Sequence, residues 1–126
     1  MKKKNIKILI WSYGSFFKRK ILSVLLSNKI IIEKIFTKKN IKAKKLNIVS
    51  TEKSFFENNQ SKFVYINSAQ SMHFKNITKC LEKNLNVICE KTLCSNYQQT
   101  KKVINLAKKK KIKVNNLFIF YTSSSF

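Results

Sequence analysis

The chain has 126 residues and a formal net charge of +22, from 27 lysine and arginine residues against 5 acidic ones. A length of this order predicts one domain, large enough to bury a layered core. No apolar run approaches the roughly 18 residues of a membrane-spanning helix, and the N-terminal residues lack a signal-peptide cleavage pattern. The 3 cysteines have no spacing typical of a disulfide framework or a zinc site. We therefore expect a cytoplasmic protein with no membrane partner and no metal ligands.

The positive charge has two explanations. A strongly basic surface is typical of proteins that bind nucleic acids or other anions. However, the chain is enriched in lysine, asparagine, isoleucine and phenylalanine, whose codons are rich in A and T, so a bias in base composition explains the charge without a ligand. Bidentate phosphate contacts favour arginine, and Arg19 is the one arginine of the chain. We expect nucleic acid to bind only non-specifically, through charge.

The first predicted strand, residues 6–11, is followed by a turn and a helix. The strand is apolar except for one lysine, as expected of a strand covered on both faces. A strand, a tight turn and a helix start form the place where a dinucleotide pyrophosphate binds, because main-chain N–H groups and the positive helix end attract phosphate. This pattern predicts cofactor contacts at Ser12, Gly14, Ser15 and Phe16. The helix is expected to face inward with Ile21, Leu22, Leu25 and Leu26.

The turn departs from the dinucleotide fingerprint G-x-G-x-x-G/A, which aligns with Ser12, Gly14 and Phe17. Only the middle glycine is kept, the one that lets the backbone approach the pyrophosphate. We expect Ser12 to take the tight-turn conformation, at a cost of about 1 kcal/mol if its φ is positive. Phe17 places a ring where the helix and the strand should touch.

The second predicted strand, residues 30–36, ends at Thr37 and Lys38. An acidic residue at this place holds the adenosine ribose of NAD, whereas nearby positive charge accommodates the 2′-phosphate of NADP. The sequence has Thr37, Lys38 and Lys39 and no carboxylate, which favours NADP; the alternative is that these lysines belong to the general lysine background. The cofactor expected at Thr37 and Lys38 is thus NAD or NADP, with a lean to NADP.

Short elements come next: a helix over residues 41–46, an extended piece at 48–49 and a helical turn over 52–57. The stretch from residue 63 to residue 114 then alternates apolar runs with helical patterns. Predicted strands cover 63–66 and 87–89, and a last one begins at Ile112. The first helix between them carries Phe74, Ile77 and Leu81 on one face; the second starts at a capping box of Ser95 and Gln98 and carries Val103, Ile104, Leu106 and Ala107.

Strands that alternate with helices predict parallel β-α-β units, since a parallel return needs a crossover. We therefore expect an α/β fold: a Rossmann-like, doubly wound parallel sheet in three layers, forming a single domain over residues 1–126.

Two segments at the predicted strand ends, residues 67–73 and 87–93, resemble the N-terminal domain of the Gfo/Idh/MocA oxidoreductases, the glucose–fructose oxidoreductase and inositol dehydrogenase family. The family pattern is a strand, a T-P-N-x-x-H-like turn, a helix, a strand and then E-K-P. His73, Glu90 and Lys91 match it, while Ala69 and Thr92 stand where the family has proline. The resemblance extends in element order from about residue 6 to residue 121.

The resemblance implies a nicotinamide dinucleotide as the bound partner and assigns roles to residues. Ser68 and His73 lie in the turn beside the cofactor, Glu90 contacts the nicotinamide ribose, and Lys91 lies beside the nicotinamide and the substrate as the catalytic residue. For His73 itself, the sequence offers no acidic partner nearby, so we expect a polar residue at a helix start rather than a catalytic base. In the family the peptide bond between this lysine and the following proline is often cis. Because residue 92 is threonine, we expect a trans bond after Lys91, which would point the lysine in a different direction from that of the family.

In the family the last strand leads into a second domain with the substrate pocket and usually the oligomer interface. This sequence ends soon after the apolar residues 117–120. The first hypothesis is a truncated and degenerate nucleotide-binding domain that is not catalytic alone. The second is a half-enzyme completed by a separate C-terminal domain or by a second copy of the chain. The third is a non-enzymatic, basic nucleic-acid-binding protein.

Overall fold

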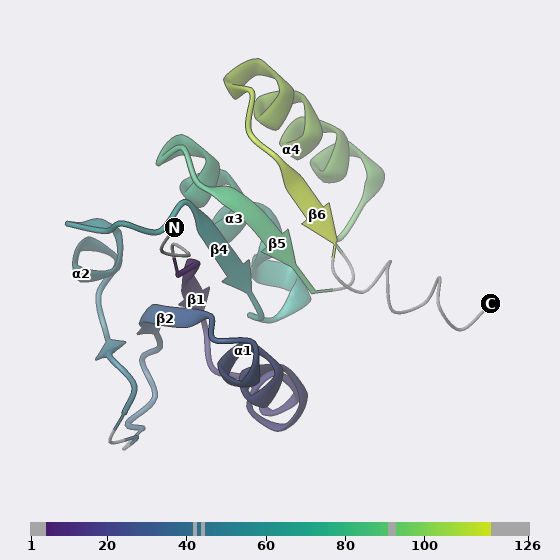
Figure 1. Cartoon of the computed structure of the whole chain (residues 1–126). Coiled ribbons are helices and arrows are strands. Elements are labelled where there is room, and N and C mark those ends of the chain that lie inside the picture. Colours follow the sequence, from purple (N-terminus) through teal and green to yellow (C-terminus); the bar gives the residue numbers. More distant parts are fainter. Residues whose placement is uncertain (1–4, 42, 44, 91–92, 117–126) are drawn as a thin grey trace.

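A computed structural model describes residues 5–41, 43, 45–90 and 93–116. These residues form a six-stranded sheet in the order β3-β2-β1-β4-β5-β6, in which each pair of neighbours is parallel (Figure 1). The strands are β1 (Lys7–Trp11), β2 (Ile31–Phe36), β3 (Ile48–Val49), β4 (Phe63–Ile66), β5 (Asn86–Cys89) and β6 (Val114–Asn116). The order reverses at β1, so β1 and β4 form the switch point of a doubly wound sheet.

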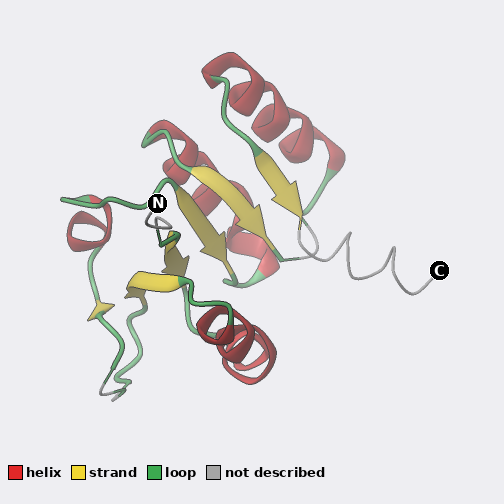
Figure 2. Ribbon diagram, in the orientation of Figure 1, coloured by secondary structure: helices red, strands yellow, loops and turns green. Residues whose placement is uncertain are grey.

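Helices cover both faces of the sheet, which confirms the predicted three-layer Rossmann-like fold (Figure 2). One face carries α1 (Leu22–Ser27), which continues a π-helical turn, η1 (Phe17–Ile21). The other carries α2 (Glu52–Phe56), α3 (His73–Glu82), which follows the short 3-10 helix η2 (Gln70–Met72), and α4 (Tyr97–Lys110). The apolar runs form strands because both faces of the central strands are buried.

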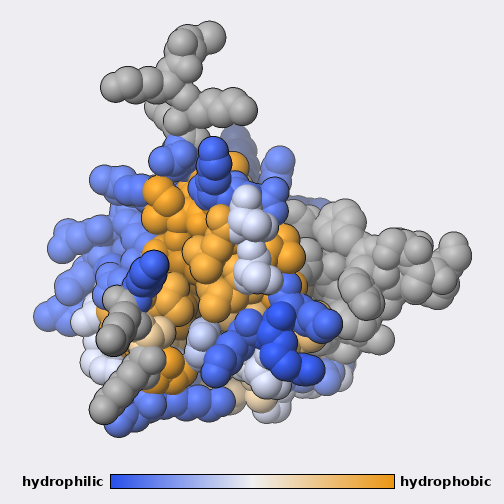
Figure 3. Space-filling view, turned by 60° about the horizontal axis from the view of Figure 1, so that its bottom comes forward, coloured by the Kyte–Doolittle hydropathy of each residue, from blue (hydrophilic) through white to orange (hydrophobic). Residues whose placement is uncertain are grey.

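The two faces differ in how much they bury. On the side of α2, α3 and α4, the core includes the fully buried side chains of Phe55, Ile77 and Leu81. On the side of α1, the buried core consists of Ile8, Ile10, Phe17, Ile35 and Tyr65. Helix α1 itself contributes no fully buried residue, and Figure 3 shows a hydrophobic area bordered by hydrophilic side chains on the side of the molecule that carries it.

Three sequence expectations need correction. Leu26 does not face inward: it is 53% exposed and lies in the last turn of α1, which ends at Ser27. The helix predicted over residues 41–46 is not formed by the described residues 41, 43, 45 and 46; the segment is half lysine and offers no continuous apolar face.

The capping box of α4 lies one residue later than predicted. Asn96 is the N-cap, and its Oδ1 accepts a hydrogen bond from the Gln99 N–H at 2.9 Å. Gln99 Oε1 accepts in turn from the Ser95 N–H at 3.3 Å. Asparagine and serine are equally good N-caps, so the local sequence does not distinguish the two possible starts. The helix that follows buries Val103 and Ala107. No helix among the described residues is both long and apolar enough to span a bilayer.

Candidate functional site

The predicted site residues that the structure describes meet at one edge of the sheet. Because every strand is parallel to its neighbours, the carboxyl ends lie together. Ser12, Thr37 and Glu90 directly follow β1, β2 and β5, and Ser68 follows β4 by two positions. In open α/β sheets, ligands bind in the crevice outside the carboxyl ends of the strands, where the strand order reverses. The candidate site is therefore the edge around β1 and β4.

The turn after β1 begins with a strained residue. Ser12 has φ 79°, a conformation that costs a residue with a Cβ about 1 kcal/mol. This result confirms the expected tight turn. The main chain of Ser12 is fully bonded, because its N–H donates to the Phe36 carbonyl at 2.8 Å and its carbonyl accepts from Asn67 Nδ2 at 2.7 Å.

Asn67 is the site residue that the sequence reasoning missed. Its side chain is buried and its Oδ1 accepts a hydrogen bond from the Gly14 N–H at 2.7 Å. A Cβ on Gly14 would lie 3.1 Å from this oxygen, so the close approach that the structure shows at Gly14 is to Asn67. A polar residue directly after the buried run of β4 was the available signal, but its partner lies 53 positions earlier in the chain.

The helix after the turn starts at Ser15 and is continuous to residue 27. Ser15 is exposed and Phe16 is half-buried, at the helix start predicted to meet a phosphate. Phe17 is fully buried, and its ring centroid lies 5.5 Å from that of Tyr65 and 5.9 Å from that of Tyr13. The ring does occupy the contact between helix and sheet, as expected, and the helix is π-helical from this residue on.

Two hollows flank the turn. One, of about 510 Å³, is lined by Trp11, Ser12, Phe36, Thr37, Lys38, Lys39, Glu52, Ser68, Met72, Lys75, Asn76 and Lys79. The other, of about 420 Å³, is lined by Tyr13, Gly14, Ser15, Lys18, Lys39, Asn40 and Ile41. Lys39 lines both, so the hollows adjoin on either side of the turn, and lysines outnumber carboxylates in their walls. The local field favours an extended anionic ligand.

The lysines at the end of β2 are exposed, whereas Thr37 is buried. The Thr37 N–H donates to the Val49 carbonyl at 3.0 Å, and its Oγ1 accepts from the Lys39 N–H at 3.1 Å. These bonds fix the direction in which the chain leaves the sheet. Thr37 thus holds the loop that carries Lys38 and Lys39 into the larger hollow.

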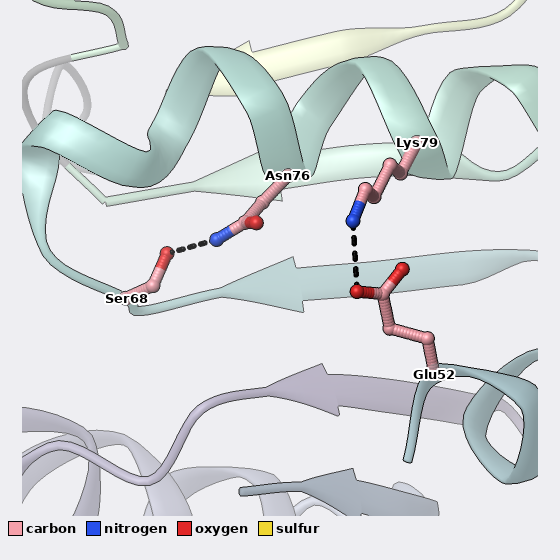
Figure 4. A network of polar contacts seen from close by, with 4 residues as sticks. All are labelled: Glu52, Ser68, Asn76 and Lys79. Carbon is pink, nitrogen blue, oxygen red and sulfur yellow. Dashed lines mark hydrogen bonds and ion pairs between the residues drawn. The ribbon is translucent and has the colours of Figure 1, made fainter.

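The opposite wall of the larger hollow comes from α3 and the segment after β4 (Figure 4). Asn76 Nδ2 donates to Ser68 Oγ at 2.8 Å, and Lys79 pairs with Glu52 at 2.7 Å. Lys79 and Glu52 offset each other, and the other charged side chains that line the hollow are lysines. His73 is 1% exposed, and its Nε2 lies at hydrogen-bond distance, 2.8 Å, from the Ser68 carbonyl oxygen. The buried His73 side chain therefore helps to hold the Ser68 segment in place beside the hollow.

Glu90 lies further along the same edge and is half-buried. Its Oε2 accepts a hydrogen bond from the Tyr65 hydroxyl at 2.6 Å. Burial raises the pKa of Glu90, while the Tyr65 hydrogen bond and the charge of His73 partly offset that rise. Burial and the contact with Glu90 also raise the pKa of Tyr65. Tyr65 is thus a hydrogen-bond partner of Glu90 that the sequence did not reveal. The predicted catalytic residue, Lys91, and its peptide bond to Thr92 lie outside the described residues.

A family model described as "Oxidoreductase family, NAD-binding Rossmann fold", that of Gfo/Idh/MocA, matches residues 7–118. No curated protein matches the chain in sequence.

Solved structures share the fold. They include KijD10, a 3-ketoreductase from Actinomadura kijaniata in complex with NADP and TDP-benzene (TM-score 0.84, 18% identity, 94% of this chain and 38% of that one). A probable oxidoreductase, yhhX, has a TM-score of 0.81 at 21% identity, covering 88% of this chain and 35% of that one. The dehydrogenase MviM from Clostridium difficile has a TM-score of 0.77 at 22% identity, with coverages of 88% and 38%. The chain thus spans well under half the length of these structures.

Proposed function

Because this chain belongs to the Gfo/Idh/MocA oxidoreductase family with its NAD-binding Rossmann fold, we propose that the carboxyl edge of its sheet binds a nicotinamide dinucleotide. The pyrophosphate would lie over the turn after β1, held by main-chain N–H groups of Ser15 and Phe16 at the helix start. The observation that carries the proposal is the pair of lysine-lined hollows on either side of this turn, at the point where the strand order reverses.

The residues of the larger hollow fit the adenosine half of the cofactor. Thr37 and Lys38 would contact the ribose, and Lys38 and Lys39 would attract a 2′-phosphate, which favours NADP over NAD. The one carboxylate in the wall, Glu52, is already paired with Lys79 and opposes a phosphate less than a free carboxylate would. Ser68 would close the hollow from the β4 side, supported by His73 and Asn76.

Glu90 is the residue proposed for the nicotinamide ribose. Its Oε2 is engaged by Tyr65, so Oε1 would accept from a ribose hydroxyl. When bound, the cofactor supplies the hydride for reduction of a substrate. Lys91, as the proposed catalytic residue, would lie beside that substrate.

Turnover is proposed to need groups from outside this domain. The chain spans 35% to 38% of the length of the enzymes to which it is similar in fold. Holding a substrate carbon against the nicotinamide contributes up to roughly 7–11 kcal/mol to catalysis, and one half of a cleft does not supply it. A second domain, or a second copy of the chain, would complete the site. NADPH oxidation by this chain alone, with any carbonyl substrate, would contradict this part of the proposal.

Cofactor binding can be measured through Trp11, the single tryptophan of the chain, which lines the larger hollow. We expect NADPH to quench its fluorescence and to bind more tightly than NADH. Replacing Lys38 and Lys39 together with Gln should weaken NADPH about tenfold and leave NADH less affected, because the phosphate contact is lost. The matched control replaces Lys108 and Lys109, exposed at the end of α4, and removes the same charge. Failure of both nucleotides to bind at millimolar concentration would overturn the proposal.

A further inference from the structure

We propose that Asn67 is the positioning residue of the turn after β1. In the fingerprint, glycines form this turn through their backbone freedom; here the Asn67 side chain holds the turn in place. The consequence for ligand binding rests on the proposed function; the role in holding the turn does not. Asn67 is 8% exposed and directly follows β4, the neighbour of β1.

The Asn67 amide binds three main-chain groups of the segment that it faces. Its Nδ2 donates to the carbonyls of Trp11 at 3.1 Å and Ser12 at 2.7 Å, and its Oδ1 accepts from the Gly14 N–H at 2.7 Å. The main chain adds a further bond, from the Asn67 N–H to the Trp11 carbonyl at 3.0 Å. The asparagine amide offers two N–H donors and an acceptor oxygen in one plane. Ionised aspartate has no donor and serine has one O–H, so neither can make the full set.

These bonds explain how the turn tolerates Ser12. A residue with a Cβ at φ 79° is strained and persists only where its surroundings hold it. The Asn67 Nδ2 bonds the carbonyls of Trp11 and Ser12, which lie on either side of the Ser12 Cα. The bond from the Gly14 N–H to Oδ1 then holds the next part of the turn.

The same contact gives Gly14 a specific reason to lack a side chain. Gly14 does not have a positive φ, so its conformation alone would admit other residues. The atoms that a Cβ would meet are both from Asn67: Oδ1 at 3.1 Å and the carbonyl oxygen at 3.5 Å. The two positions are therefore coupled, because the glycine leaves the space that the amide uses.

This geometry also assigns the phosphate donors. With the Gly14 N–H occupied by Asn67, an anion over the turn would meet the N–H groups of Ser15 and Phe16. Asn67 would act on binding only through the position of these groups and would not touch the ligand.

The chain contains a single glycine, so selective isotope labelling of glycine yields one amide resonance, that of Gly14. We expect this amide to exchange slowly with solvent in the wild-type chain. Asn67→Ala should accelerate its exchange by about tenfold, because one buried hydrogen bond is lost. The matched control is Asn59→Ala, which removes an amide that donates to the Phe55 carbonyl at 2.6 Å, away from the turn. Exchange as fast as that of an exposed amide in the wild-type chain, or equal rates in the two variants, would overturn the proposal.

A double-mutant cycle tests the coupling and covers the case in which Asn67→Ala does not fold. Gly14→Ala should lower the free energy of unfolding in the wild-type chain, and lower it less in the Asn67→Ser background, which lacks the oxygen that a Cβ would meet at 3.1 Å. Equal shifts in both backgrounds would contradict the coupling.

Binding provides the last readout. The NADPH affinity of Asn67→Ala should fall about tenfold, while Asn59→Ala should bind like the wild-type chain. An unchanged affinity in Asn67→Ala would remove its role in the site. If the wild-type chain binds no nucleotide, the proposed function fails, and the Gly14 amide still decides whether Asn67 holds the turn.

Discussion

The two ends of the sheet carry carboxylates in opposite situations. At the amino end, Glu33 of β2 accepts hydrogen bonds from the main chain of Gln60 at 3.0 Å and Ser61 at 2.9 Å, and from the Ser61 hydroxyl. At the carboxyl end, Glu90 is half-buried and, among the described residues, accepts a hydrogen bond from the Tyr65 hydroxyl. Glu33 thereby ties β2 to the segment before β4, whereas Glu90 keeps capacity for a further contact.

The pKa values follow this difference. Burial pushes the pKa of Glu33 upward, but the bonds from Ser61 and Gln60 and the charge of Lys7 outweigh it, so the net shift is downward. For Glu90 burial prevails and the pKa is raised. At the amino end the Glu33 carboxylate is held by several hydrogen bonds that stabilise its charged form. At the carboxyl end the Glu90 carboxylate is half-buried with a raised pKa, as is common at functional sites.

The backbone shows the same contrast among the described residues. Left-handed residues at the amino end, Lys29, Asn58, Asn84 and Lys111, each lie between the end of a helix and the next strand, where a left-handed residue commonly ends a helix. At the carboxyl end the left-handed residue is Ser12, in the turn of the candidate site. Strain at that end is retained where a ligand is proposed to bind.

The largest expected effect is on stability. Glu33→Gln should lower the free energy of unfolding by about 1–2 kcal/mol, because several N–H groups lose a charged acceptor that is partly exposed. Glu90→Gln should change it by less than about 0.5 kcal/mol, or raise it, since a buried charge is removed. Urea unfolding at neutral pH measures both. Equal losses in the two variants would mean that the two ends of the sheet do not differ in this way.

The pH dependence should have opposite signs. The folded-state pKa of Glu33 lies below its ordinary value of 4.5, so its contribution is present above pH 4.5 and is lost as the pH falls through the folded-state pKa. The folded-state pKa of Glu90 lies above 4.5, so its contribution is present below pH 4.5 and is lost as the pH rises through the folded-state pKa.

Melting temperatures between about pH 3 and pH 7 measure these contributions. Relative to the wild-type chain, Glu33→Gln should flatten the rise of stability with pH. Glu90→Gln should make stability rise more steeply, and Tyr65→Phe should move the Glu90 titration to higher pH. A Glu90 titration unchanged by Tyr65→Phe would remove the role given to that hydroxyl.

The smallest effect concerns backbone strain. Ser12→Gly should stabilise the fold by up to about 1 kcal/mol, because glycine adopts a positive φ without a steric cost. Asn84→Gly, at the amino end with φ 61°, should gain less because asparagine already tolerates the conformation. Thermal unfolding of the two variants gives the comparison. A larger gain at Asn84 than at Ser12 would show that the turn is not the strained position.

Much of the fold could be predicted from local sequence. The strands coincide with the apolar runs within a residue or two, since a strand buried on both faces cannot carry many polar residues. The family resemblance seen at His73 and Glu90 is confirmed by the match over residues 7–118. Two of the details that were predicted wrongly are the N-cap of α4, for which Ser95 and Asn96 are equally good candidates, and the burial of Leu26, which lies in the last turn of α1.

The position of the candidate site could be predicted from the sequence, but the hydrogen bonds between its residues could not. Ser12, Gly14, Thr37 and Glu90 could be placed at one edge because parallel strands end together. Their roles toward a cofactor stay predictions, as does that of Lys91.

By itself, the sequence determined an alternating parallel sheet with a strained turn at its switch point, because hydrophobic periodicity and turn chemistry act over a few residues. Only the tertiary structure decided which side chains hold that site together. Asn67 meets Gly14 across 53 positions of the chain and Tyr65 meets Glu90 across 25. The pairing of neighbouring strands sets such contacts, and no local pattern encodes them.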